Sequence, residues 1–206
     1  MTFIKSTFIF GAAAIVGACS SSAPTVTSSG GQYTVTQDGS SVTTSGSVST
    51  LTGGLSSWNT PDVRAYIQDN ADFTAAAVVD RTDSDKIYSV ISGTAAGSVP
   101  TAGTATYTGR YGVLRVTAAH GGTPWGFAGE QTSNVDFAAG TIVGSGGTDG
   151  FAYNASISGS SISGTMSFTG DGAVTAPISG GFYGPSTLAG VFSADSITGL
   201  FYGVTP

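Results

Sequence analysis

The second half of the chain alternates between apolar and small polar residues with a period of two. Residues 151–158 place Phe151, Tyr153, Ala155 and Ile157 on one face, and residues 162–168 repeat the pattern with Ile162, Gly164, Met166 and Phe168. Successive side chains of a β-strand point to opposite sides, so this period predicts half-buried strands with one face on a core.

Short glycine-containing segments separate the alternating runs. Residues 138–140, 158–160 and 170–172 supply glycine where a tight turn needs a positive φ. About eight strands of roughly six to nine residues fit between such turns. A meander of that length closes most simply into an up-and-down barrel, which leaves no sheet edge open. We therefore expect an all-β chain whose residues 98–206 form an eight-stranded antiparallel up-and-down β-barrel.

Mid-strand glycines such as Gly144 and Gly164 agree with this expectation, because they let a strand bend where a small barrel curves. Residues 32–97 are expected to form a small β-rich N-terminal part. Within it, residues 75–79 and 86–92 are predicted to pair as strands across a polar turn.

A short helix is expected from Thr60 onward. Thr60 is a typical N-cap residue, and Pro61 is favoured at the first position of a helix. Val63, Tyr66 and Ile67 would then share one helical face.

The N-terminus has the features of an exported, lipid-modified protein. Lys5 precedes an apolar run over residues 8–18 that is too short to span a bilayer comfortably. Residues 16–19 (VGAC) end at Cys19, the only cysteine, and resemble a bacterial lipobox. We therefore predict a lipoprotein signal peptide over residues 1–18, a lipid-carrying Cys19 with diacylglycerol and palmitate-type chains, and a flexible tether over residues 19–31.

The charge balance limits the partners of the chain. With 12 acidic and 6 basic residues the net charge is -6, which excludes nucleic-acid binding through phosphates and adhesion to anionic lipid heads. Acyl chains must therefore supply the attachment to the membrane. Ser20, rather than Asp, follows Cys19, and by the rule for bacterial lipoproteins this permits export to the outer membrane. We therefore predict a lipid-anchored protein of the outer membrane, and whether it is exposed at the cell surface stays open at this point.

The sequence lacks the groups that catalysis and metal binding require. His120 is the only histidine, and no G-x-S-x-G motif accompanies it. One histidine and one cysteine exclude two-histidine and cysteine-based zinc sites. P-loop and dinucleotide fingerprints are also absent. We therefore expect no enzymatic activity, no metal site and no cofactor.

Several motifs in the second half match one family in order. Residues 100–109 (PTAGTATYTG) look like an opening barrel strand, residues 135–144 like a hairpin, and residues 178–192 (ISGGFYGPSTLAGVF) like a closing segment. In this order they resemble the barrel of transferrin-binding protein B-like surface lipoproteins. The resemblance implies an eight-stranded barrel behind a smaller sheet, in a lipoprotein that binds a partner and does not catalyse.

The resemblance leaves the ligand open, because the best-known relatives capture host transferrin while others bind factor H or haem. The candidate partner-binding loop contains His120, Trp125 and Phe127, and Trp58 with Tyr66 forms a second candidate anchor. The leading hypothesis is capture of a host protein or solute in iron or haem acquisition. The alternatives are a carrier that binds haem or a small molecule at the His120 loop, with His120 as axial ligand, and a structural envelope lipoprotein.

Overall fold

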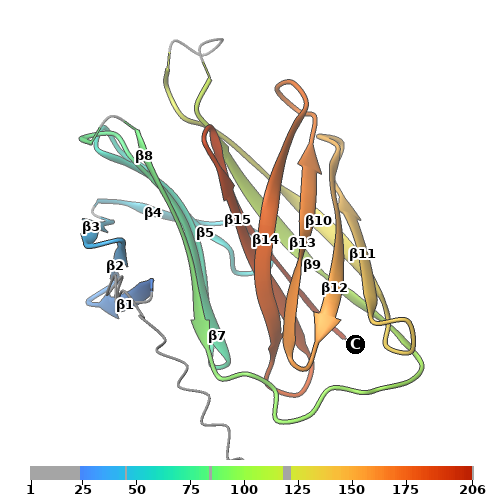
Figure 1. Cartoon of the computed structure of the whole chain (residues 1–206). Helices are drawn as coiled ribbons and strands as arrows, with labels where there is room; N and C mark the ends of the chain where they lie inside the picture. The colour runs from blue at the N-terminus through green and yellow to red at the C-terminus, as the bar shows by residue number, and fades with distance from the viewer. Residues whose placement is uncertain (1–23, 45, 84, 118–121, 206) are drawn as a thin grey trace, which may run out of the picture.

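The computed structural model of the chain describes residues 24–44, 46–83, 85–117 and 122–205. These residues form three antiparallel sheets, of which the last is a closed barrel (Figure 1). The first sheet contains β1 (Thr25–Ser29), β2 (Gln32–Gln37) and β3 (Ser40–Thr43); the second contains β4 (Val48–Thr50), β5 (Ser56–Asn59), β6 (Val63–Asp69), β7 (Phe73–Asp80) and β8 (Lys86–Gly93). The barrel contains β9 (Thr104–Arg115), β10 (Trp125–Asp136), β11 (Thr141–Gly146), β12 (Phe151–Ser158), β13 (Ser161–Phe168), β14 (Val174–Tyr183), β15 (Thr187–Ala194) and β16 (Ile197–Val204).

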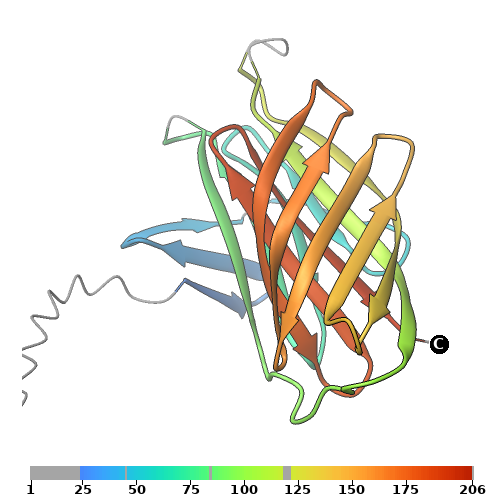
Figure 2. The same ribbon diagram turned by 45° about the vertical axis from the view of Figure 1, so that its right-hand side comes forward.

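The barrel confirms the predicted eight-stranded up-and-down architecture. Each strand pairs with the next along the chain, and β16 closes the ring by pairing with β9 from Ile197 opposite Arg115 to Val204 opposite Thr108. Figure 2 shows these strands side by side and tilted. Closure satisfies the backbone groups that an open sheet would leave at its edges.

The two walls of the barrel differ in burial. On β11 to β13 buried and exposed residues alternate, because the inner face meets the core and the outer face meets solvent. On β15 and β16 almost every residue is buried. A second layer must therefore cover the outer face of these two strands.

The five-stranded sheet is that second layer. Phe73 of β7 packs against Tyr183 and Tyr202 of the barrel, with ring centroids 5.5 and 6.3 Å apart. The buried hydroxyl of Thr198 on β16 also donates a 3.0 Å hydrogen bond to the carbonyl oxygen of Tyr88 on β8. Apolar contacts and a hydrogen bond from a side chain to the backbone thus join the sheet to the barrel.

The three-stranded sheet covers the other face of the five-stranded sheet. Val35 and Val42 are buried there against a cluster that includes Trp58, whose ring packs edge-on against Tyr33 at 5.5 Å. Strand β1 lies within residues 19–31, for which the sequence suggested a flexible tether. Its pairing with β2 places Val26 opposite Val35, which explains why residues 25–29 become ordered strand.

The helix predicted from Thr60 is wrong, because residues 63–69 form strand β6. Thr60 does act as a local cap: its hydroxyl accepts a 3.0 Å hydrogen bond from the amide of Val63, but the chain then turns into a strand. Tyr66 is buried on the side of the barrel, and Val63 is buried on the side of the three-stranded sheet. A helix would instead have placed these two residues on the same face, because they are three positions apart. Within the part of the chain described, no helix is long and apolar enough to cross a membrane.

Candidate functional site

Side chains fill the interior of the barrel. Tyr111 stacks on Phe151 with centroids 4.4 Å apart, and Tyr153 lies 4.3 Å from Phe201. Such close packing leaves these rings as core, as in protein interiors generally. A ligand of this protein must therefore be sought on the outside of the barrel rather than within it.

A chain of hydrogen bonds also crosses the barrel core. The hydroxyls of Tyr153 and Ser133 lie 2.5 Å apart, Ser133 donates to the side-chain oxygen of Gln131 at 2.8 Å, and the amide of Gln131 donates to the carbonyl oxygen of Tyr202 at 2.8 Å. Burial raises the pKa of Tyr153 above its usual range, although its bond with Ser133 opposes the shift. The neutral phenol therefore persists at physiological pH, and the chain of bonds is structural.

The predicted loop lies at one rim of the barrel, between β9 and β10, and His120 falls outside the described residues. The ends of the loop are tied down by three hydrogen bonds. Arg64 of the five-stranded sheet donates to the carbonyl oxygen of Pro124 at 3.1 Å, and the hydroxyl of Thr117 donates to Asp171 at 3.0 Å. Arg115 donates to the carbonyl oxygen of Gly172 at 3.1 Å.

Trp125 and Phe127 belong to strand β10 rather than to the loop. Trp125 begins the strand at the rim and is 47% exposed. Phe127 lies two residues further along the strand, and its ring packs against Phe168 of the core with the ring centroids 5.0 Å apart. The structure thus leaves Trp125 as the aromatic side chain of this group that an approaching partner can contact.

The second pair of candidate anchors lies inside the molecule. Trp58 is buried between the three-stranded and five-stranded sheets, and Tyr66 is buried between the five-stranded sheet and the barrel. Burial is the main cause that raises the pKa of Tyr66, and the nearby Arg64 acts in the opposite direction. In this structure both aromatic side chains hold layers of the fold together.

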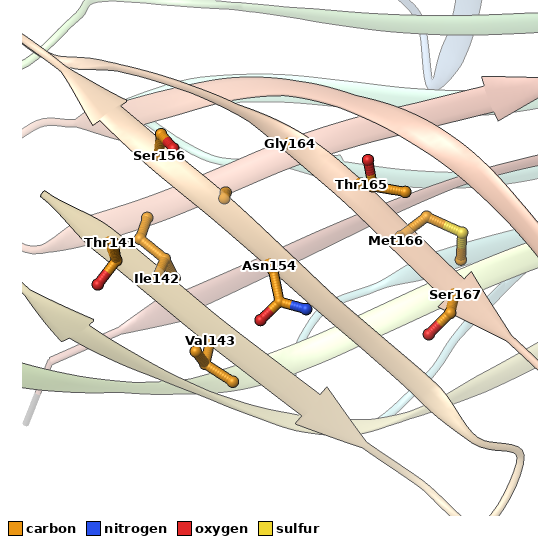
Figure 3. Close-up of a pocket in the computed structure, with 10 residues that line it drawn as sticks. Thr141, Ile142, Val143, Asn154, Ser156, Gly164, Thr165, Met166 and Ser167 are labelled. Carbon is orange, nitrogen blue, oxygen red and sulfur yellow. The ribbon is translucent and has the colours of Figure 1, made fainter.

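A shallow hollow of about 540 Å³ lies on the free outer wall of the barrel. Figure 3 shows the side chains of Thr141, Asn154 and Thr165 on three neighbouring strands, β11, β12 and β13. None of the residues that line this hollow is ionisable, and Val143 among them is 55% exposed. The hollow offers hydroxyl and amide groups to a neutral ligand and has no acid or base for catalysis.

A smaller groove of about 440 Å³ lies where the turn between β4 and β5 meets the barrel. Arg110 of β9 and Glu130 of β10 lie opposite each other along its floor. Neither residue was among the candidates predicted from the sequence. The sequence does contain a signal for Arg110, because this arginine interrupts the run of threonines at alternate positions of β9. Among the residues described, no group of three or more His, Cys, Asp or Glu side chains could hold a metal ion.

Comparisons with known proteins agree with the fold. Transferrin-binding protein B from Haemophilus parasuis Hp5, as a point mutant, superposes with a TM-score of 0.56 at 17% identity, over 84% of this chain and 40% of that one. Intact Ap-TbpB, with its N and C lobes, gives 0.55 at 16% identity, over 84% and 41%. A structure described as a surface lipoprotein gives 0.52 at 19% identity, over 68% and 80%.

The chain therefore spans about two fifths of the length of the transferrin-binding protein B structures that it matches. No curated protein sequence matches it. Residues 99–205, which include the whole barrel, match the family model for the C-lobe and N-lobe beta barrels of Tf-binding protein B. The chain belongs to this family of transferrin-binding protein B barrels.

Proposed function

We propose that this chain is a non-enzymatic lipoprotein of the outer membrane, held by acyl chains on Cys19, that binds a host protein in iron acquisition. The observation that carries the proposal is the closed barrel of the transferrin-binding protein B family, whose interior is filled with aromatic rings. A filled barrel cannot enclose a ligand, so binding must use its outer surface. The rim beside Trp125 is the part of that surface we propose for the partner.

The rim suits this role for two physical reasons. Trp125 offers a large amphipathic side chain of the type that dominates binding energy at protein interfaces. Hydrogen bonds from Arg64 and Arg115 hold the neighbouring backbone, so little ordering entropy is lost when a partner binds.

Binding can be tested with the acyl-free mature protein, residues 20–206, immobilised on a sensor and exposed to iron-loaded transferrins from several vertebrates. Serum albumin serves as the control ligand. We expect saturable binding to at least one transferrin, weakened about 30-fold by Trp125→Ala at unchanged melting temperature. Val143→Ala, a matched change on the free wall, should leave the affinity unchanged. Absence of binding to every transferrin would remove the iron-acquisition role.

Anchoring requires a separate experiment in cells. The wild-type protein should incorporate labelled palmitate, float with outer-membrane vesicles and be digested by protease added to intact cells. The Cys19→Ala variant should not incorporate palmitate. The haem alternative is tested by an absorbance titration. A Soret band that disappears in His120→Ala would support it, and an unchanged spectrum would exclude it.

A further inference from the structure

The groove between the β4–β5 turn and the barrel has an ordered floor. Strands β16, β9 and β10 lie side by side there, and their registers place outward residues in two rows across the three strands. One row is Val204, Thr108 and Thr132, and the other is Tyr202, Arg110 and Glu130. Thr52 and Gly53 of the turn form the facing wall.

Arg110 is fixed in this groove by its aliphatic stem. A Cβ atom placed on Gly53 would lie 2.6 Å from Cδ of Arg110, so the turn packs directly on the stem. The turn is itself held, because the hydroxyl of Tyr202 donates a hydrogen bond to the carbonyl oxygen of Gly53. Gly53 has a φ of 83°, which glycine adopts without strain.

The guanidinium of Arg110 has unused hydrogen-bonding capacity. Its Nε is buried and has no partner. Among the residues that the structure describes, no hydrogen bond or ion pair reaches its other nitrogens. A buried donor without a partner is unfavourable, and a guanidinium matches a carboxylate with two parallel hydrogen bonds.

Glu130 narrows the class of ligand. Its exposed carboxylate lies opposite Arg110 on the next strand, so a doubly charged phosphate would be repelled. A ligand with a single carboxylate and with N–H donors beside it would fit better, because its carboxylate can bind Arg110 and its N–H groups can donate to Glu130. The threonine hydroxyls can hydrogen-bond peptide groups, and Val204, 44% exposed, offers an apolar contact.

We propose that this groove is a second binding site, which takes an extended peptide segment of a protein partner through an Asp or Glu side chain held by Arg110. The site lies on the side wall of the barrel, away from the rim at Trp125, where β10 begins. It therefore does not depend on the proposed role of Trp125 or on lipidation, and the two proposals can fail separately.

The side chain of Arg110 provides a direct readout. The folded part of the chain holds arginines only at positions 64, 81, 110 and 115, so the Nε–H region of a ¹⁵N NMR spectrum is simple. The probe is a short blocked peptide of alanines with one central glutamate, and the matched control carries glutamine instead. Free glutarate tests whether any small acid suffices.

We expect the glutamate peptide to shift the Nε–H resonance of Arg110 selectively. The glutamine peptide and glutarate should bind with an affinity at least about tenfold lower. Arg110→Gln should abolish the response at an unchanged melting temperature. Glu130→Gln, an exposed change, should strengthen glutarate binding because it removes a like charge. If Arg110→Gln does not fold, the wild-type spectra still decide the question.

Three results would overturn the proposal. The first is that the Nε–H resonance of Arg110 does not shift selectively at peptide concentrations up to about 10 mM, because any binding would then be too weak for recognition. The second is an equal response to the glutamine peptide, because the carboxylate would then not be read. The third is tighter binding of glutarate than of the glutamate peptide, which would make the groove a small-acid site.

Discussion

Replacement of Phe73 by alanine tests whether the five-stranded sheet and the barrel unfold as one unit. Phe73 is 2% exposed and contacts Tyr183 and Tyr202 on the barrel. Truncation of a buried phenylalanine costs about 3–5 kcal/mol of unfolding free energy. In a chain of this size each kcal/mol lowers the melting temperature by about 2–4 °C, so Phe73→Ala should melt about 6–20 °C lower.

The two tryptophans make the experiment specific to each layer. Trp58 is buried in the five-stranded sheet, whereas Trp125 lies on the barrel. In a Trp125→Phe background, the fluorescence of Trp58 follows the sheet and far-UV circular dichroism follows mainly the barrel. If the two layers form one unit, both signals change at the same temperature and shift together in Phe73→Ala.

The matched control is Val143→Ala, which removes an exposed side chain on the free wall and should change the unfolding free energy by less than about 0.5 kcal/mol. The sheet and the barrel do not unfold as one unit if Phe73→Ala lowers the transition temperature of Trp58 fluorescence while that of the circular dichroism stays unchanged. Residues 32–97 would then be an independent domain that merely rests on the barrel.

Two further predictions concern the core and the tyrosines. A side chain at Gly144 would overlap the ring of Tyr153, so Gly144→Ala should cost about 1–3 kcal/mol in thermal unfolding, while Gly97→Ala, where no atom lies within 4 Å, should cost almost nothing. Burial is the main cause that raises the pKa of all eight tyrosines, and that of Tyr33 rises to about 12 with Asp69 contributing. Their stabilisation is complete below the unfolded pKa of about 10 and is lost as the pH rises through the folded values, so stability should fall above pH 10. The measurement is the tyrosinate absorbance of the native protein against pH, compared with that of the protein unfolded in urea. A native midpoint at about pH 10, equal to that in urea, would contradict the raised pKa values.

The exposed wall of the barrel was predictable from sequence because its two faces meet different surroundings. Along β12, Phe151, Tyr153 and Ala155 face the core, while Asn154 and Ser156 face solvent, and the period of two follows. This alternation, with glycine at the turns, suffices to predict strand type, count and order. Closure of β16 onto β9 then removes the remaining edges.

The covered wall was harder to predict, because both faces of β15 and β16 are apolar. The run from Leu188 to Phe192 and the run from Leu200 to Tyr202 contain few polar residues, so period two disappears. Such runs signal that a second layer covers the strand, but they do not say which segment supplies it. For the same reason Val63, Tyr66 and Ile67, buried on both faces of β6, could be mistaken for one face of a helix.

The candidate site was predicted in part. Trp125 and Phe127 share one side of β10 by the strand period, yet their surroundings differ, because Phe127 lies inside the barrel and Trp125 lies at its rim. That difference depends on where β10 begins, and strand ends are the least predictable feature of a sequence. Arg110 was missed because its role depends on Gly53, which lies 57 positions earlier and meets it only in the folded chain.

The division of the barrel surface limits how a partner can engage it. The interior is filled, and the five-stranded sheet covers β15 and β16, so a partner must use the remaining outer surface, which includes the rim, the neutral wall and the Arg110 groove. Contact at Trp125 would bury aromatic surface and depend little on ionic strength, whereas a carboxylate on Arg110 is held by charge and weakens as salt screens it. A partner that uses both surfaces should therefore lose only the groove's share of its affinity in salt, and Arg110→Gln should remove that salt dependence while leaving the contribution of Trp125 intact.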